Sequence, residues 1–272
     1  MKNNLLMSMA IAASLASGLT TIGVAQDYGT SVDAPQTGPQ YVIRLGAGGL
    51  YKPKFAGASE YLLSPFPIIK VDRLYLPGFG QVVDGSVKTS GFSVYPSFSV
   101  IGERSASDSN DLTGTNKVDF AVEAGFGVRY RHDWLQGFAE IRQGFGGHEG
   151  QVGRLGLDVI TQPTEQLELV FGPRVNWGSD NYTRTYFGVT AAEAAAAGSV
   201  LTAFRPGSGI TSYGVDLQAN YAYTEKTTLH FRAGWDRFVG DAADSPIVKR
   251  GNEDQFSVGL GLSYRFDFDL FE

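Results

Sequence analysis

Apolar and polar residues alternate strictly along the end of the chain. From Phe256 to Leu270 the even positions are apolar or aromatic, and the odd positions are glycine, serine, arginine or aspartate. Successive side chains of a β-strand point to opposite faces, so this pattern predicts a long strand with one apolar face. The same alternation, in places weaker, recurs in the segments 41–51, 62–71, 91–101, 117–131, 135–145, 151–161, 166–177, 212–223 and 227–238.

Short and long connections alternate between these segments. Tight polar turns are expected at 131–134, 161–165 and 223–226, and longer segments at 102–116, 144–150, 178–210 and 240–254. This asymmetry is typical of up-and-down barrels of the outer membrane, whose short turns face the periplasm. An even number of strands places both termini on that side. We predict twelve strands, with an extra hairpin near Pro77-Gly78, and keep ten as the alternative. One or two helical turns are expected in 190–198.

The first 25 residues differ in kind from the rest. Lys2 precedes a run of apolar and small residues, and Gly23-Val24-Ala25 provides small residues before a cut. This order predicts a cleaved secretory signal over 1–25. Residues 26–39 are expected to form a disordered periplasmic lead-in, and 40–272 the barrel. No other stretch of the chain approaches 18 consecutive apolar residues.

Alternation alone does not separate a membrane barrel from a soluble β-sandwich. Three features favour contact with lipid. The segments run to about 11–15 residues, whereas soluble strands average about 5–6. Their polar faces are rich in glycine, which weakens a water-facing strand. Aromatic residues gather near the segment ends, as in the girdles at membrane interfaces. We therefore predict a transmembrane antiparallel β-barrel, with a soluble periplasmic β-protein as the alternative.

Composition excludes several classes of function. The chain has no cysteine, so disulfides and thiolate metal sites are excluded, and its net charge of −6 gives no support for nucleic-acid binding. The three histidines fall in separate segments, and no nucleophile motif accompanies them. We expect no enzymatic activity, no metal and no cofactor.

Charged residues alternate with the apolar ones and are expected to face the lumen. They could form a selectivity ring in a channel, or pair with one another and fill a narrow barrel. The set is Asp119, Glu123, Arg129, Arg131, Glu140, Arg142, Arg154, Asp158, Glu168, Arg174, Asp216, Arg232, Asp236 and Arg265. The near balance of the two signs favours mutual pairing.

Several segments resemble the MipA/OmpV family of MltA-interacting outer-membrane proteins. They are GLYKPKFAGASEY (49–61), SPFPIIKVDRLYL (64–76), EIRQGFGGHEGQVGRLGL (140–157), YFGVTAAEAAAAG (186–198) and GDAADSPIVKRGNEDQFSVGLGLSYRF (240–266). The first segment departs from the family, which usually has Tyr-Glu-Gly-Ser where this chain has Phe55 to Ser59.

The resemblance implies a protein of the Gram-negative outer membrane, linked to peptidoglycan (murein) synthesis and turnover. A scaffold that joins a lytic transglycosylase to a penicillin-binding synthase is the implied role. A small-solute channel or stress-responsive permeability protein is the alternative. The lipid bilayer and the barrel-assembly machinery are further expected partners. Gly261, Tyr264 and Phe266 match the signal that such machinery is expected to read, although the chain continues six residues beyond Phe266.

Overall fold

The computed structural model describes residues 38–77, 80–84, 90–198 and 200–270. The expected signal 1–25 and most of the lead-in 26–39 lie outside the described residues. Among the helices of the described residues, none combines the length and the apolar character needed to span a membrane.

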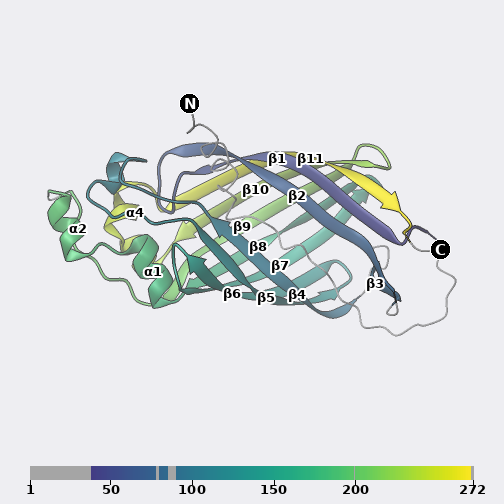
Figure 1. Cartoon of the computed structure of the whole chain (residues 1–272), viewed down its shortest axis with the longest axis horizontal. Helices are drawn as coiled ribbons and strands as arrows, with labels where there is room; N and C mark the ends of the chain where they lie inside the picture. Colours follow the sequence, from purple (N-terminus) through teal and green to yellow (C-terminus); the bar gives the residue numbers. More distant parts are fainter. Residues whose placement is uncertain (1–37, 78–79, 85–89, 199, 271–272) are drawn as a thin grey trace, which may run out of the picture.

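The described chain forms one antiparallel sheet of eleven strands that curls into a barrel (Figure 1). The strands are β1 (Tyr41–Pro53), β2 (Tyr61–Leu76), β3 (Gly80–Asp84), β4 (Gly91–Ile101), β5 (Ala121–His132), β6 (Leu135–Gly146), β7 (Gln151–Thr164), β8 (Leu167–Gly178), β9 (Gly209–Ala222), β10 (Thr227–Phe238) and β11 (Asp254–Phe268). From β4 to β11 each strand pairs with its neighbours in sequence, and β1 pairs with both β2 and β11. The predicted up-and-down antiparallel fold is therefore confirmed.

The strand count differs from the predicted twelve. The segment 62–71 and the extra hairpin expected near Pro77-Gly78 correspond to the 16-residue strand β2 and the five-residue strand β3. Leu76 pairs with Gly80, so the expected hairpin lies at this point. The other ten strands have 11 to 16 residues, enough to cross a bilayer when tilted. The wall thus has the ten long strands of the alternative, and β3 is a short addition.

The two edges of the sheet are β3 and β4, and no ladder between them is present in the described ranges. Prolines lie on strands on both sides of this unpaired gap. Pro65 and Pro67 lie on β2, next to the edge strand β3, and Pro96 lies on β4. A proline has no amide hydrogen to donate, so sheets tolerate it where the strand edge is unpaired. The placement of these prolines follows from the position of their strands in the sheet.

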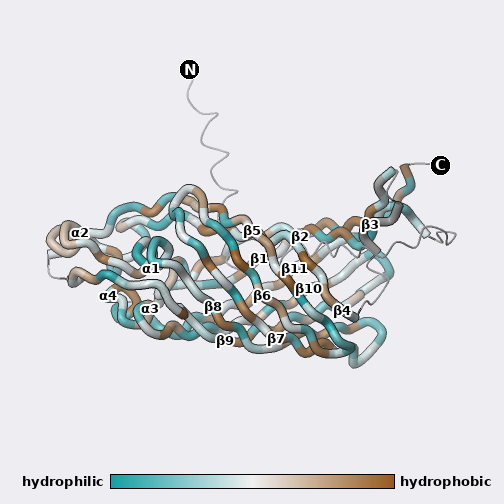
Figure 2. Tube along the Cα trace, turned by 90° about the horizontal axis from the view of Figure 1, so that it is seen from below, coloured by the Kyte–Doolittle hydropathy of each residue, from teal (hydrophilic) through white to brown (hydrophobic). Residues whose placement is uncertain are grey.

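The barrel is apolar outside and polar inside. On β11 the side chains of Leu260 and Phe256 are 65% and 52% exposed, whereas Ser263, on the other face, is fully buried. Arg174 and Asp158 are each only 4% exposed, as in few soluble proteins. Figure 2 shows the alternation of hydrophobic and hydrophilic residues along the strands. An apolar exterior around buried charged side chains is the arrangement that a lipid environment favours.

Helices gather at one end of the barrel, which we call the cap end (Figure 1). They are α1 (Asp180–Phe187), α2 (Ala191–Ala196), α3 (Gly240–Asp244), α4 (Pro246–Arg250) and the 3₁₀ turn η2 (Asn110–Leu112). The helical turn expected within 190–198 is α2, where Thr190 and Glu193 form a reciprocal capping box. The cap is made of the long connections that the sequence predicted.

The opposite end, which we call the hairpin end, carries the short turns. They link β5 to β6, β7 to β8 and β9 to β10, and Tyr41 of β1 pairs there with Phe268 of β11. In the first turn Asp133 has a φ of +50°, a conformation that aspartate tolerates better than most residues. Both ends of the described chain lie at this end, as an even number of crossing strands requires.

Contact with lipid predicts a depth-dependent cost for charge on the outer face. Leu260→Arg, in the middle of β11, should lower the free energy of unfolding by about 2–4 kcal/mol in lipid vesicles. Leu270→Arg is the matched control, because Leu270 is 64% exposed but lies beyond the end of β11. It should cost no more than about 1 kcal/mol. Equal small effects in urea titrations of both variants would show that water covers this face.

Candidate functional site

A carboxylate and arginine cluster fills the lumen below the cap. Arg142 on β6 donates from Nε to Glu123 Oε2 of β5 at 2.9 Å and from Nη1 to Glu140 Oε2 at 2.7 Å. Tyr95 on β4 donates its hydroxyl to Glu140 Oε1 at 3.0 Å. Glu123 is only 2% exposed. Both carboxylates therefore share one guanidinium, and the Tyr95 hydroxyl supplies a further donor to Glu140.

His148 extends this cluster toward the cap. Its side chain is fully buried, with Nε2 3.3 Å from Glu123 Oε1, and its Nδ1 accepts a hydrogen bond from the Gly150 amide at 3.2 Å. The rings of Tyr182 and Tyr186 meet the imidazole edge-on at 5.3 and 5.4 Å. Because Nδ1 accepts a bond, the neutral ring carries its proton on Nε2, toward Glu123. The inward orientation of this loop histidine could not be predicted from the residues around it.

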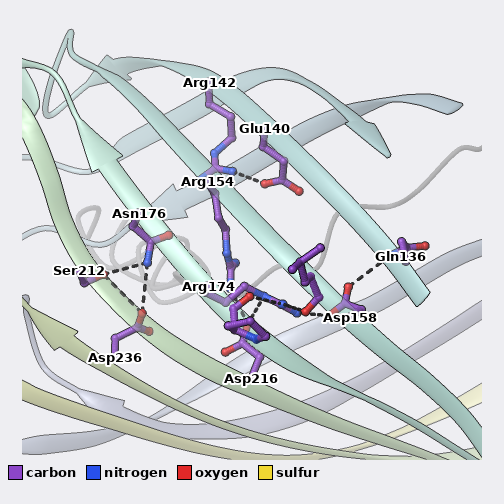
Figure 3. Close-up of polar contacts among 12 residues, drawn as sticks. Gln136, Glu140, Arg142, Arg154, Asp158, Arg174, Asn176, Ser212, Asp216 and Asp236 are labelled. Atoms are coloured by element: carbon purple, nitrogen blue, oxygen red, sulfur yellow. Dashed lines mark hydrogen bonds and ion pairs between the residues drawn. The ribbon is translucent and has the colours of Figure 1, made fainter. Parts of the chain in front are cut away.

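A second cluster lies in the middle of the lumen (Figure 3). Arg174 on β8 donates from Nη2 to Asp158 Oδ1 at 2.5 Å and from Nε to Asp216 Oδ2 at 3.1 Å. Arg154 on β7 donates to the same oxygen of Asp216 at 2.5 Å. The Arg174 guanidinium also lies 4.9 Å from the centre of the Phe138 ring. Two arginines and two aspartates from three strands thus tie one side of the barrel together.

Neutral polar groups hold the remaining lumen carboxylates. Asn176 donates to Asp236 Oδ1 at 3.1 Å, and Asn220 donates to Glu168 Oε1 at 3.1 Å. The ring of His230 lies between the Asn220 side chain and the Ser263 hydroxyl, at 2.8 and 2.7 Å.

Arg129 and Arg232 lie beside these clusters: the Arg129 guanidinium is 5.1 Å from the centre of the Tyr95 ring, and Arg232 interacts electrostatically with Asp216. Arg129 donates to the Ser93 hydroxyl at 2.9 Å, and Arg232 is half-buried on β10. At the hairpin end Arg131 donates to the Asp133 carbonyl at 3.2 Å and Arg265 pairs with Asp267 at 2.5 Å.

Asp119 does not lie in the wall. It was expected to alternate with the residues of a strand over 117–131, but β5 begins at Ala121, so Asp119 belongs to the preceding loop. Its side chain is 77% exposed and pairs with Lys117 at 3.1 Å. The alternation of apolar and charged residues continues beyond the N-terminal end of β5, and Asp119 lies two residues before that strand begins.

The expected assembly-signal residues lie on β11. Gly261 pairs with Gly48 of β1, and Tyr264 and Phe266 are 42% and 45% exposed. Their rings meet in a T-shaped contact at 5.0 Å. Recognition of these residues by assembly machinery stays a prediction.

The cap has a hydrophobic core of its own. One buried cluster joins η2, α4 and the chain around α2, and consists of Leu112, Val189, Ala197, Leu201 and Ile247. A second joins α1, α3 and α4, and consists of Tyr186, Phe187, Ala242 and Val248. Ser245 donates its hydroxyl to the Phe187 carbonyl at 2.7 Å. Four connections of the barrel are thereby packed into one folded unit.

Two charged residues that the sequence did not single out hold the cap together. Arg104 is 4% exposed and donates to the carbonyls of Tyr186 and Thr185, at the end of α1, at 2.8 and 3.2 Å. Glu193 accepts from the Asn116 amide at 2.8 Å. Burial opposes ionisation of Glu193, but its bonds to the Asn116 and Thr190 amides lower the pKa below the usual value.

The described residues offer no metal site: no group of three or more histidines and carboxylates is arranged to hold an ion. His132 pairs with Asp133 at the hairpin end, whereas His148 lies under the cap. The arrangement is suited to filling and bracing a barrel.

The middle cluster makes a direct prediction about stability. Arg174→Ala leaves Asp158, whose side chain is 6% exposed, without its guanidinium, and should lower the free energy of unfolding by roughly 3 kcal/mol. Adding Asp158→Asn should recover part of this loss, because an amide carries no charge to compensate. Arg184→Ala is the control, since Arg184 pairs with Asp180 on the exposed surface of α1 and should cost below about 1 kcal/mol. Equal losses in the two arginine variants would contradict the account.

Known proteins resemble this chain in sequence and in structure. The MltA-interacting protein of Escherichia coli (strain K12) is 28% identical over 100 residues, which are 37% of this chain and 38% of that protein. The corresponding protein of Shigella flexneri gives the same values. The match thus spans less than two fifths of either relative.

Solved outer-membrane proteins resemble the chain more distantly. OprB of Pseudomonas putida is 8% identical, with a TM-score of 0.41 over 84% of this chain and 94% of that one. OmpT of Vibrio cholerae is 7% identical, with a TM-score of 0.34 over 87% and 100% of the two chains.

A family model covers most of the chain. The model of the MltA-interacting protein MipA matches residues 45–266, from the first strand to the last. The chain therefore belongs to the MipA family of MltA-interacting proteins.

Proposed function

We propose that this protein is a non-enzymatic scaffold of the Gram-negative outer membrane that holds peptidoglycan-processing enzymes at its hairpin end. The observation that carries the proposal is membership of the MipA family over residues 45–266. The Escherichia coli relative is named for its interaction with MltA. A lytic transglycosylase is therefore the first partner to test, and a penicillin-binding synthase is the second.

The hairpin end is the surface that we assign to the partner. In outer-membrane barrels the short turns face the periplasm, where peptidoglycan lies. The turns expose Asp133, Glu165, Glu225 and Lys226, and both ends of the described chain lie beside them. Because a stable interface buries at least about 1,200 Å², several turns must contribute together.

The paired lumen supports a scaffold over a small-solute channel. Arg142 and Arg174 each bind two carboxylates, so the main charges of the lumen are occupied by one another. The folded cap covers one end of the barrel (Figure 1). In planar bilayers the purified protein should therefore give no steady ion-selective steps. Regular steps, altered in their selectivity by Arg142→Gln, would support the channel instead.

Reversal of charge at each end tests where the partner binds. In the full chain, Glu165→Lys with Glu225→Lys should weaken binding of an MltA-type lytic transglycosylase about tenfold, which corresponds to about 1.4 kcal/mol. The matched control places the same two changes at the cap end, as Glu60→Lys with Asp244→Lys, and should bind as the unaltered protein does. Both positions are exposed.

The measurement is surface-immobilised binding of the purified barrel in detergent. Failure of the unaltered barrel to bind the enzyme would overturn the scaffold. Binding that only the cap-end variant loses would place the partner on the other side of the membrane.

A further inference from the structure

A cavity of about 310 Å³ lies between the cap and the lumen wall. Its lining comes from the ends of several strands and from α1, and includes Leu50, Ile101, Val152 and Phe238 among the apolar residues. Arg104, Arg154 and Tyr186 are among the polar ones. Small-molecule sites have this character, with apolar walls and a few polar groups that fix the ligand.

Arg104 is a buried cation without a carboxylate partner in the described part of the chain. Its two terminal nitrogens donate to backbone carbonyls of α1, while its Nε is buried and has no hydrogen-bond acceptor there. Burial lowers the pKa of Arg104, which expresses the cost of holding the charge away from water. The carbonyls at the helix end satisfy part of the guanidinium. They leave the Nε donor without an acceptor, and the carboxylates of Glu193 and Asp108 act on the charge without forming an ion pair with it.

Two further donors of the same cavity lack acceptors among the described residues. The Tyr186 hydroxyl is buried without a hydrogen bond, in a side chain that is 4% exposed. Arg154 uses Nη2 for Asp216, but its buried Nε has no partner. Burial, followed by the nearby charge of Glu123, raises the pKa of Tyr186, so its hydroxyl stays protonated and can donate. A buried donor without an acceptor destabilises the fold, because it has lost its hydrogen bonds to water.

The missing partner must accept hydrogen bonds and carry negative charge. Water could satisfy the donors, but it would not compensate the guanidinium of Arg104. The cavity wall carries six basic side chains, Lys52 among them, against the four carboxylates of Glu103, Glu123, Asp216 and Asp236, so positive charge is in excess. A carboxylate is planar and accepts hydrogen bonds on two oxygens, which suits a guanidinium and a hydroxyl together. The apolar side chains of the wall would then pack against an apolar body.

We propose that the cavity under the cap binds a small organic anion, with its carboxylate at Arg104 and Tyr186 and its apolar body against Leu50, Val152 and Phe238. This assignment goes beyond the scaffold role, because it concerns the cap end and needs no protein partner. It also differs from a channel, because the ligand is held in place and the charged side chains of the lumen below it pair with one another.

Fluorine NMR of the full chain in detergent tests the site, with 4-fluorobenzoate as the probe and 4-fluorobenzyl alcohol as its neutral counterpart. The unaltered protein should bind the anion saturably and at least tenfold more tightly than the alcohol. Tyr186→Phe removes one unpartnered hydroxyl and no contact between protein groups, so it should fold normally and weaken anion binding about five- to tenfold. Tyr213→Phe, on the outer face of β9, is the matched control and should bind as the unaltered protein does.

Arg104→Lys provides a second variant should Tyr186→Phe fail to fold. It keeps the charge but lacks the Nε donor, and should also weaken anion binding. Equal binding of anion and alcohol, no saturable binding of the anion, or unchanged binding in Tyr186→Phe would each overturn the proposal. None of these outcomes bears on the partner at the hairpin end, because that binding is measured without the anion.

Discussion

Hydrogen bonding of the backbone in a medium without water is the constraint on which this structure depends. Hydrocarbon offers no partner for an amide or a carbonyl group, so a strand that crosses it must be paired along its length. From β2 through β1 and β11 to β4, antiparallel ladders join each strand to the next without a break, and in the described ranges the sheet has its two edges at β3 and β4. The side chains then follow the period of the strand, which places apolar groups outside and polar groups inside.

A polar lumen creates a second requirement, which the barrel meets by pairing its charges. Arg142 and Arg174 each serve two carboxylates, and Asn176 and Asn220 serve two more. Most of these contacts join different strands, and the bond from Asn176 to Asp236 reaches from β8 across β9 to β10, so they brace the wall as well as compensating the charges. The cap completes the enclosure with hydrophobic clusters that belong to neither the lipid face nor the lumen.

Much of the barrel could be predicted from sequence, because the alternation of apolar and polar residues can be seen within each single strand. The alternation around Phe171 and Leu260 identifies strands, and parity alone places Arg174 and Asp158 on the inner face. Where the period ends, the prediction fails: Asp119 was assigned to a strand that begins two residues later. In residues 62–84 apolar residues and prolines occur close together without regular alternation. The sequence therefore did not indicate that β2 continues without a break.

The cap could not be predicted in the same way, because contacts between distant segments determine it. Arg104 reaches the end of α1, about eighty residues away, and the Gly57 carbonyl accepts from the Asn252 amide at 2.8 Å. Local signals mark the start of α2, where Thr190 and Glu193 form a capping box, and the start of α4, where Ser245 caps the helix and Pro246 occupies its first position. The buried state of His148 depends on Tyr182 and Tyr186, which follow it by more than thirty residues.

Quenching of tryptophan fluorescence by brominated acyl chains tests most directly whether lipid covers the apolar face. The measurement uses the barrel in vesicles with Trp134, Trp177 and Trp235 replaced by phenylalanine and one tryptophan introduced, either as Leu260→Trp or, on the surface of the cap, as Val200→Trp. Val200 is 40% exposed, so both introduced rings meet the surroundings of the protein. We expect strong quenching at position 260 and little at position 200. Weak and equal quenching at both positions would contradict a lipid-covered wall.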